Sequence, residues 1–124
     1  MNKALAIAAL LEIATGVALL VMPGEVGRLL LRAESAGMAI VVSRVLGCAL
    51  IALGIACWPR RTASRMALLA MLVYGGSIAL YLGVLGVQGK FVGPLLWPAV
   101  GLHIALTIVL AIAAARDGRT AVVK

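Results

Sequence analysis

Charged side chains are scarce in this sequence, which has four acidic and eleven basic residues among 124. A soluble domain of this size needs a polar surface that so few charges cannot cover, and only about half of its residues are apolar. Here 65% of the residues are hydrophobic, and the mean hydropathy is +1.19. The composition therefore indicates a protein surrounded mostly by membrane lipid, with no separate soluble domain.

Residue types that carry chemistry are also rare. The chain has two cysteines, and Cys48 and Cys57 are nine residues apart in one apolar run. That spacing is about 13 Å along a helix, which is too far for a disulfide. No metal-ligand spacing, glycine-rich phosphate loop, nucleophile elbow or pair of intramembrane carboxylates is present. We therefore predict that the chain is not an enzyme and holds no metal.

The net charge of +7 raises the question of nucleic acid. The basic residues form short clusters between apolar runs, without the interleaved aromatic residues of a nucleic-acid surface. Basic residues at the ends of membrane spans set topology and contact anionic headgroups. The expected partners are therefore membrane lipids and other transmembrane helices, and not nucleic acid.

Four apolar runs have the length of membrane-spanning helices, about 20 residues each. The first run has Glu12 in its middle, which favours a span over a signal peptide. The predicted fold is an all-α, integral membrane four-helix bundle, with residues 1–124 forming a single transmembrane domain. The predicted spans are residues 4–22, 38–58, 66–87 and 92–115.

Three local features lie between or at the ends of these runs. The segment from Gly24 to Gly37 is amphipathic, so it forms either a short interfacial helix or a loop with one turn of helix. Pro98 predicts a kink or a first turn of helix at the start of the fourth span. Trp58 and Trp97 are expected to anchor the bundle in the two membrane interfaces.

The basic residues predict the orientation. Seven fall on one side of the membrane and three on the other, so the positive-inside rule places both termini in the cytoplasm. The expected location is a cell membrane, namely a bacterial inner membrane. The group of seven is Lys3, Arg60, Arg61, Arg65, Arg116, Arg119 and Lys124, and the group of three is Arg28, Arg32 and Lys90.

Glu12, Arg44 and His103 are the ionisable residues inside the predicted spans. Charged groups at membrane depth are costly and mark functional sites. Each shares a helix face with small residues, so we expect all three to point inward as a buried polar cluster, with Arg44 within reach of Glu12. The cluster either fixes the docking of the helices or uses Glu12 as a proton-carrying carboxylate, and His103 is a candidate haem or metal ligand.

Tyr74, Ser77 and Tyr81 lie on the third predicted span. Such tyrosines either pack inside a bundle, with their hydroxyl groups hydrogen-bonded, or line a polar cavity or quinone pocket.

Residues 5–13, Leu-Ala-Ile-Ala-Ala-Leu-Leu-Glu-Ile, resemble the first helix of small multidrug resistance transporters. In that family a single glutamate of the first span binds substrate cation and proton in turn, within a dimer, which would give Glu12 that role. The resemblance covers about a tenth of the chain, and the tryptophan- and glycine-containing third-helix signature of the family is absent. Residues 44–47 and 93–103 make the chain similar to uncharacterised four-span bacterial membrane proteins.

The sequence favours a small structural or accessory subunit of a larger membrane complex or homo-oligomer, without catalysis and without a cofactor. One alternative is a dimeric proton-coupled small-molecule transporter that uses Glu12. A second alternative is a redox subunit associated with haem or quinone through His103, and a bound pigment would also be compatible with such a subunit.

Overall fold

The computed structural model describes residues 2–59 and 65–122, and all regular structure in these ranges is helical. Four of the helices are long and apolar enough to cross a membrane, which confirms the predicted all-α fold with four apolar helices. The remaining helix, α2, is short. The helices are α1 (Asn2–Val21), α2 (Pro23–Leu31), α3 (Met38–Ala56), α4 (Arg65–Gln88) and α5 (Leu96–Val122).

Proline and glycine residues mark the ends of the helices. Pro23 ends α1 and occupies the first turn of α2, where its missing N–H costs nothing. The amphipathic segment is thus a helix as far as Leu31, and Arg32 follows in the left-handed conformation with φ 55°. Gly89, with φ 71°, follows α4. Pro98 lies in the first turn of α5, which begins at Leu96.

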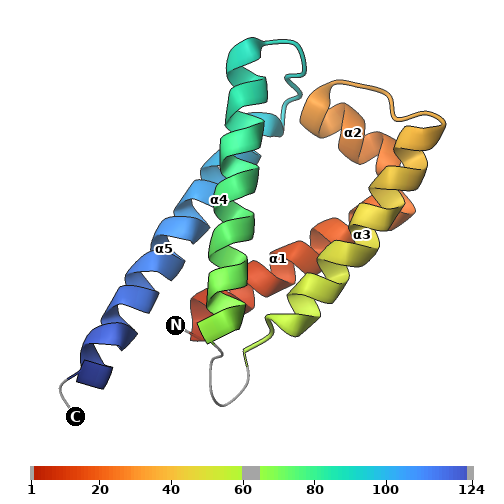
Figure 1. Ribbon diagram of the computed structural model, residues 1–124. Helices are drawn as coiled ribbons and strands as arrows, with labels where there is room; N and C mark the ends of the chain where they lie inside the picture. Colours follow the sequence, from red (N-terminus) through yellow and green to blue (C-terminus); the bar gives the residue numbers. More distant parts are fainter. Residues whose placement is uncertain (1, 60–64, 123–124) are drawn as a thin grey trace.

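The long helices form two antiparallel pairs, α1 with α3 and α4 with α5. Figure 1 shows that the pairs diverge towards the end of the bundle where α2 lies. Helix α1 connects the two pairs, because it also contacts α4 and α5, and its residues Leu5, Ala8 and Ala9 belong to the core shared with them. The beginning of α1 and the last turns of α5 lie at the opposite end from α2 (Figure 1).

Glycine residues allow α1 and α3 to cross at close range. A Cβ atom on Gly16 would lie 2.6 Å from the carbonyl oxygen of Gly47, and a Cβ atom on Gly47 would lie 2.6 Å from that of Gly16. At Gly54 an added Cβ atom would lie 2.6 Å from the carbonyl oxygen of Ala9. Small residues let membrane helices approach in this way and gain backbone contact. The close crossing of α1 and α3 therefore depends on glycine at positions 16, 47 and 54.

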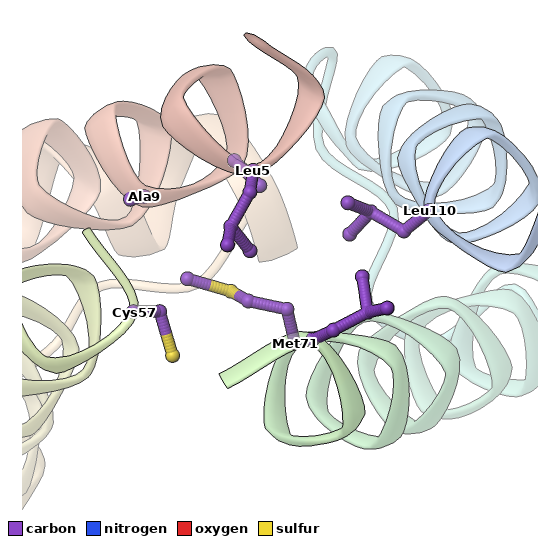
Figure 2. Close-up of a cluster of buried hydrophobic side chains, with 7 residues drawn as sticks. Leu5, Ala9, Cys57, Met71 and Leu110 are labelled. Carbon is purple, nitrogen blue, oxygen red and sulfur yellow. The ribbon is translucent and has the colours of Figure 1, made fainter. Parts of the chain in front are cut away.

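An apolar core joins all four long helices at the end away from α2 (Figure 2). Leu5 of α1 points towards Met71 of α4 and Leu110 of α5, whereas Ala9 lies further along α1 on the side of Cys57, which follows α3. Both cysteines are free, with Cys57 buried in this core and Cys48 exposed on α3. This core holds the two helix pairs together.

At the other end, α2 holds the connection between α4 and α5. The backbone amides of Gly93 and Leu95 donate hydrogen bonds to the carbonyl oxygens of Leu30 (3.1 Å) and Leu29 (2.9 Å). Gly93 has no room for a side chain, because a Cβ atom there would overlap the backbone of Leu29. The last turn of α2 thus caps the α4–α5 pair.

Replacing Gly93 with alanine should open this cap. The added methyl group displaces the Leu29 backbone, and both hydrogen bonds are lost, each contributing roughly 0.5–1.5 kcal/mol. We expect hydrogen exchange at the Leu95 amide to become about five- to 150-fold faster. Gly101→Ala is the matched control, because no neighbouring atom lies within 4 Å of a Cβ atom at that position. Equal exchange rates in the two variants would contradict the cap.

Candidate functional site

Glu12 is the one buried charged side chain among the described residues, with 5% of its surface exposed. It lies on the face of α1 that also contains Ala8 and Gly16, both of which are buried. Ala8 belongs to the apolar core and Gly16 to the α1–α3 crossing. The carboxyl group is therefore positioned between the two most tightly packed regions of the bundle.

Tyr74 of α4 and His103 of α5 complete the polar cluster around Glu12. Their rings meet edge to face, with centroids 6.0 Å apart and planes inclined by 73°, a favourable aromatic geometry. The Tyr74 hydroxyl group lies within reach of the Glu12 carboxyl group. Tyr74 thus lies between the carboxyl group of Glu12 on α1 and the imidazole ring of His103 on α5.

Thr107 is a further polar residue at this level that the site prediction missed. It follows His103 by one turn of α5, and its Oγ1 atom is buried without a hydrogen-bond partner. Gly75 makes room for it, since a Cβ atom on Gly75 would lie 2.8 Å from Oγ1. The spacing of four residues from His103 is the sequence signal that places Thr107 on the same face.

Arg44 lies apart from the other two predicted members of the cluster. It is exposed on α3, whereas His103 is half-buried and Glu12 is buried. Because α1 and α3 are antiparallel, Glu12 and Arg44 lie on opposite sides of the Gly16–Gly47 contact, offset by about 10 Å along the helices. The ion pair found in the described part of the chain joins Arg28 to Glu25 on α2, at 2.6 Å. The structure therefore brings Glu12 to Tyr74, whose ring contacts His103, and not to Arg44.

A shallow apolar groove of about 670 Å³ runs between α4 and α5. Gly76, Ala79 and Gly83 line it on the α4 side together with larger apolar residues, and Trp97 and Ile104 line it on the α5 side. Ser77 and Tyr81 are exposed and do not line the groove, and Tyr74 belongs to the polar cluster instead. The three residues predicted to line a cavity, Tyr74, Ser77 and Tyr81, therefore do not line this groove.

Trp58 and Trp97 are both exposed, at opposite ends of the bundle: Trp58 follows the end of α3, and Trp97 lies in the first turn of α5.

No group of three metal-binding side chains occurs within residues 2–59 and 65–122. Chemically, Glu12, Tyr74 and His103 offer a carboxyl, a hydroxyl and an imidazole group, each of which is able to form hydrogen bonds. Comparison of the chain with family models, with curated proteins and with solved structures found no match.

Proposed function

We propose that this chain is a multi-pass protein of the cell membrane that works as a non-catalytic subunit of a larger assembly. The observation that carries this proposal is the exposure of Arg44 on a helix that is otherwise apolar. Arg44 lies six residues into α3, about 9 Å from the beginning of the helix. Its exposed neighbours Val41 and Val45 are apolar.

A guanidinium group that faces lipid is unfavourable. Placing an arginine at the centre of a spanning helix costs about 3 kcal/mol on insertion scales. The cost is smaller at Arg44, which lies about 9 Å from the beginning of α3, because a long side chain reaches towards the membrane interface. A partner that supplies a carboxylate would lower it further. The described acidic residues of this chain do not pair with Arg44. An exposed guanidinium group in a spanning helix, with no ion pair to a described carboxylate, supports an assembly with another chain.

The polar cluster of Glu12, Tyr74 and His103 has a structural role in this proposal. It lies where the two helix pairs touch, and contacts between the pairs are otherwise confined mainly to the apolar core. Interhelical hydrogen bonds in membranes contribute about 0.6 kcal/mol on average and up to about 1.7. The cluster thus fixes how the pairs dock without requiring any reaction.

We further infer that both termini lie in the cytoplasm and that the membrane is a bacterial inner membrane. Lys3, Arg65 and Arg116 lie at the end of the bundle opposite α2, and the positive-inside rule makes that end cytoplasmic. The remaining basic residues of this group, Arg60, Arg61, Arg119 and Lys124, fall outside the part of the chain whose side chains are described.

Cysteine labelling tests this orientation. In a background of Cys48→Ser and Cys57→Ala, Lys90→Cys should react with a membrane-impermeant maleimide in intact cells. Arg65→Cys should react only after permeabilisation, because it lies on the cytoplasmic side. Both substituted residues are exposed, so burial does not bias the comparison. The opposite labelling pattern would contradict cytoplasmic termini.

A second candidate function, proton-coupled transport in a dimer, is favoured by the burial of Glu12 away from Arg44. A carboxyl group without a neighbouring cation is free to bind a proton or a cationic substrate. In that case a proton gradient drives substrate transport in proteoliposomes that contain the wild-type chain. The variant Glu12→Gln abolishes this transport while the fold is retained. The leading proposal expects no such transport from the wild-type chain.

Purification from the native membrane in a gentle detergent tests the leading proposal. The mass and the absorption spectrum of the particle are recorded together. We expect a particle larger than the 12.7 kDa chain, with other subunits in fixed ratio. A monomeric particle would overturn the assembly. A Soret band would instead support the alternative in which His103 binds haem together with a ligand from another chain.

A further inference from the structure

The groove between α4 and α5 extends over about half the depth of a membrane. Its lining on α4 begins at Gln88, the last residue of the helix, and ends at Gly76, twelve residues earlier, which is a length of about 18 Å. On α5 the lining runs from Trp97 to Ile108, a length of about 17 Å. One leaflet of the hydrocarbon core is about 15 Å thick. The groove therefore spans the leaflet on the α2 side of the bundle and ends near the membrane centre.

We propose that this groove binds one acyl chain of a glycerophospholipid, with the phosphate group of the lipid at the mouth of the groove beside Lys90. The inference is independent of the assembly proposed above, because it concerns α4 and α5 and not Arg44. The groove volume of about 670 Å³ lies within the range of about 300–1,000 Å³ that is usual for ligand sites.

The inner surface of the groove is suited to a hydrocarbon chain, because it is almost entirely apolar. Thr107 lies at the deep end, but its Oγ1 atom is buried beside Gly75 and does not reach the groove. Gly76 and Gly83 leave space for the chain, since no atom lies within 4 Å of a Cβ atom at either position. A polar ligand would therefore find no hydrogen-bonding partner inside the groove.

The polar side chains of the site lie at the mouth of the groove, where a lipid headgroup would lie. Gln88 lines the mouth, and the exposed Lys90 follows it by two residues. Trp97 adds an indole ring, which favours the membrane interface. Lys90 forms no ion pair with a described acidic residue, so its ammonium group is free to contact a phosphate. The sequence of groups from the mouth inwards, cationic, then polar, then apolar, is complementary to a phospholipid.

A transmembrane helix is the other occupant that could fill an apolar groove. Such a helix crosses about 30 Å of hydrocarbon, whereas the groove stops after about 18 Å. One and two turns before Gly76, the same side of α4 has the large side chains of Leu72 and Leu69, and Leu72 packs against the apolar core. The length of the groove thus favours an acyl chain over a helix.

The two tryptophans of the chain provide a local probe, since Trp97 lines the groove and Trp58 lies at the opposite end of the bundle. The full chain with Trp58→Phe is titrated in detergent with phosphatidylglycerol that has brominated acyl chains, which quench nearby tryptophans. We expect saturable quenching of Trp97, and native mass spectrometry should show one retained lipid per chain. In the control Trp97→Phe, the remaining Trp58 should be quenched only in proportion to the total lipid.

Gly76→Leu should fill the deep half of the groove without disturbing the fold, because a side chain there meets no other part of the chain. We expect phosphatidylglycerol to bind at least about fivefold more weakly, as for an overpacked contact. Gly101→Leu is the matched control, because Gly101 is exposed on α5, does not line the groove and also has no atom within 4 Å of a Cβ atom. It should bind the lipid as the wild type does.

Lys90→Gln tests the contact with the phosphate group. We expect this variant to bind brominated phosphatidylglycerol about fivefold more weakly. Its binding of a brominated diacylglycerol, which has the same acyl chains and no phosphate, should be unchanged. Equal binding of phosphatidylglycerol by Lys90→Gln and the wild type would contradict the proposed position of the phosphate.

Three further outcomes would overturn the inference. Quenching of Trp97 that does not saturate, like that of Trp58, would show that lipid only surrounds the bundle. Equal binding by Gly76→Leu and Gly101→Leu would place the lipid outside the groove. If the native particle held no lipid and lost another protein in Gly76→Leu, a helix would occupy the groove, and the assembly proposed above would still stand.

Discussion

The variant Gly47→Val should push α1 away from α3 and lower the free energy of unfolding by about 3 kcal/mol, since overpacking a tight contact typically costs 1–3 kcal/mol. Even the Cβ atom would meet the Gly16 carbonyl oxygen at 2.6 Å and the Leu20 Cγ atom at 3.1 Å. A backbone atom cannot rotate out of the way, so the helices must separate. Reversible unfolding in bicelles or mixed micelles measures the change.

Gly83→Val is the matched control for this prediction. Gly83 also lies inside a spanning helix, but no atom of the rest of the structure lies within 4 Å of a Cβ atom there. Its unfolding free energy should change by no more than about 0.5 kcal/mol, the usual range for surface substitutions. Equal losses in the two variants would mean that glycine is needed for a reason other than the helix crossing.

The second large effect is expected for Glu12→Lys. An ammonium group would be buried beside Tyr74 with no ion pair to a described carboxylate, and an uncompensated buried charge costs about 3–5 kcal/mol. We expect the variant to be degraded, or to unfold at markedly lower denaturant concentration than the wild type. Quantitative immunoblotting of membranes, followed by unfolding of the purified protein, measures both effects.

Glu12→Gln separates charge from shape in this experiment. The amide keeps the size of the side chain and can still accept a hydrogen bond from Tyr74, so we expect a loss of no more than about 1 kcal/mol. If Glu12→Lys were as stable as Glu12→Gln, the environment of residue 12 would have to be open to water or lipid headgroups. That result would contradict the burial on which the polar cluster depends.

The fold was largely predictable because hydrophobic runs and helix breakers are local signals. The first apolar run ends at Pro23, and α1 ends at Val21. The predicted fourth span was less accurate, since α5 begins at Leu96 and not at residue 92. Gly93 and Leu95 are held by hydrogen bonds to α2, a contact between distant parts of the chain that no local pattern contains.

The polar cluster was only partly predictable, because its membership depends on the rotation of each helix. The spacing of Ala8, Glu12 and Gly16 correctly indicated a packed face of α1, and all three are buried. Arg44 was grouped with Gly47 and Cys48, yet Gly47 is buried and the other two are exposed. Gly47 and Cys48 follow Arg44 by three and four residues, so they lie on either side of it around the helix. The sequence does not say which of these two sides of α3 contacts α1.

The mass of the native particle in Arg44→Leu, compared with Lys90→Leu, tests the central claim most directly. Both residues are exposed, so neither change should unfold the chain. We expect Arg44→Leu to yield a folded monomer and Lys90→Leu to keep the mass of the wild-type assembly, because Arg44 lies inside a spanning helix and Lys90 lies outside one. If Arg44→Leu kept the full assembly mass, Arg44 would not hold the chain in its complex, and the account would be wrong.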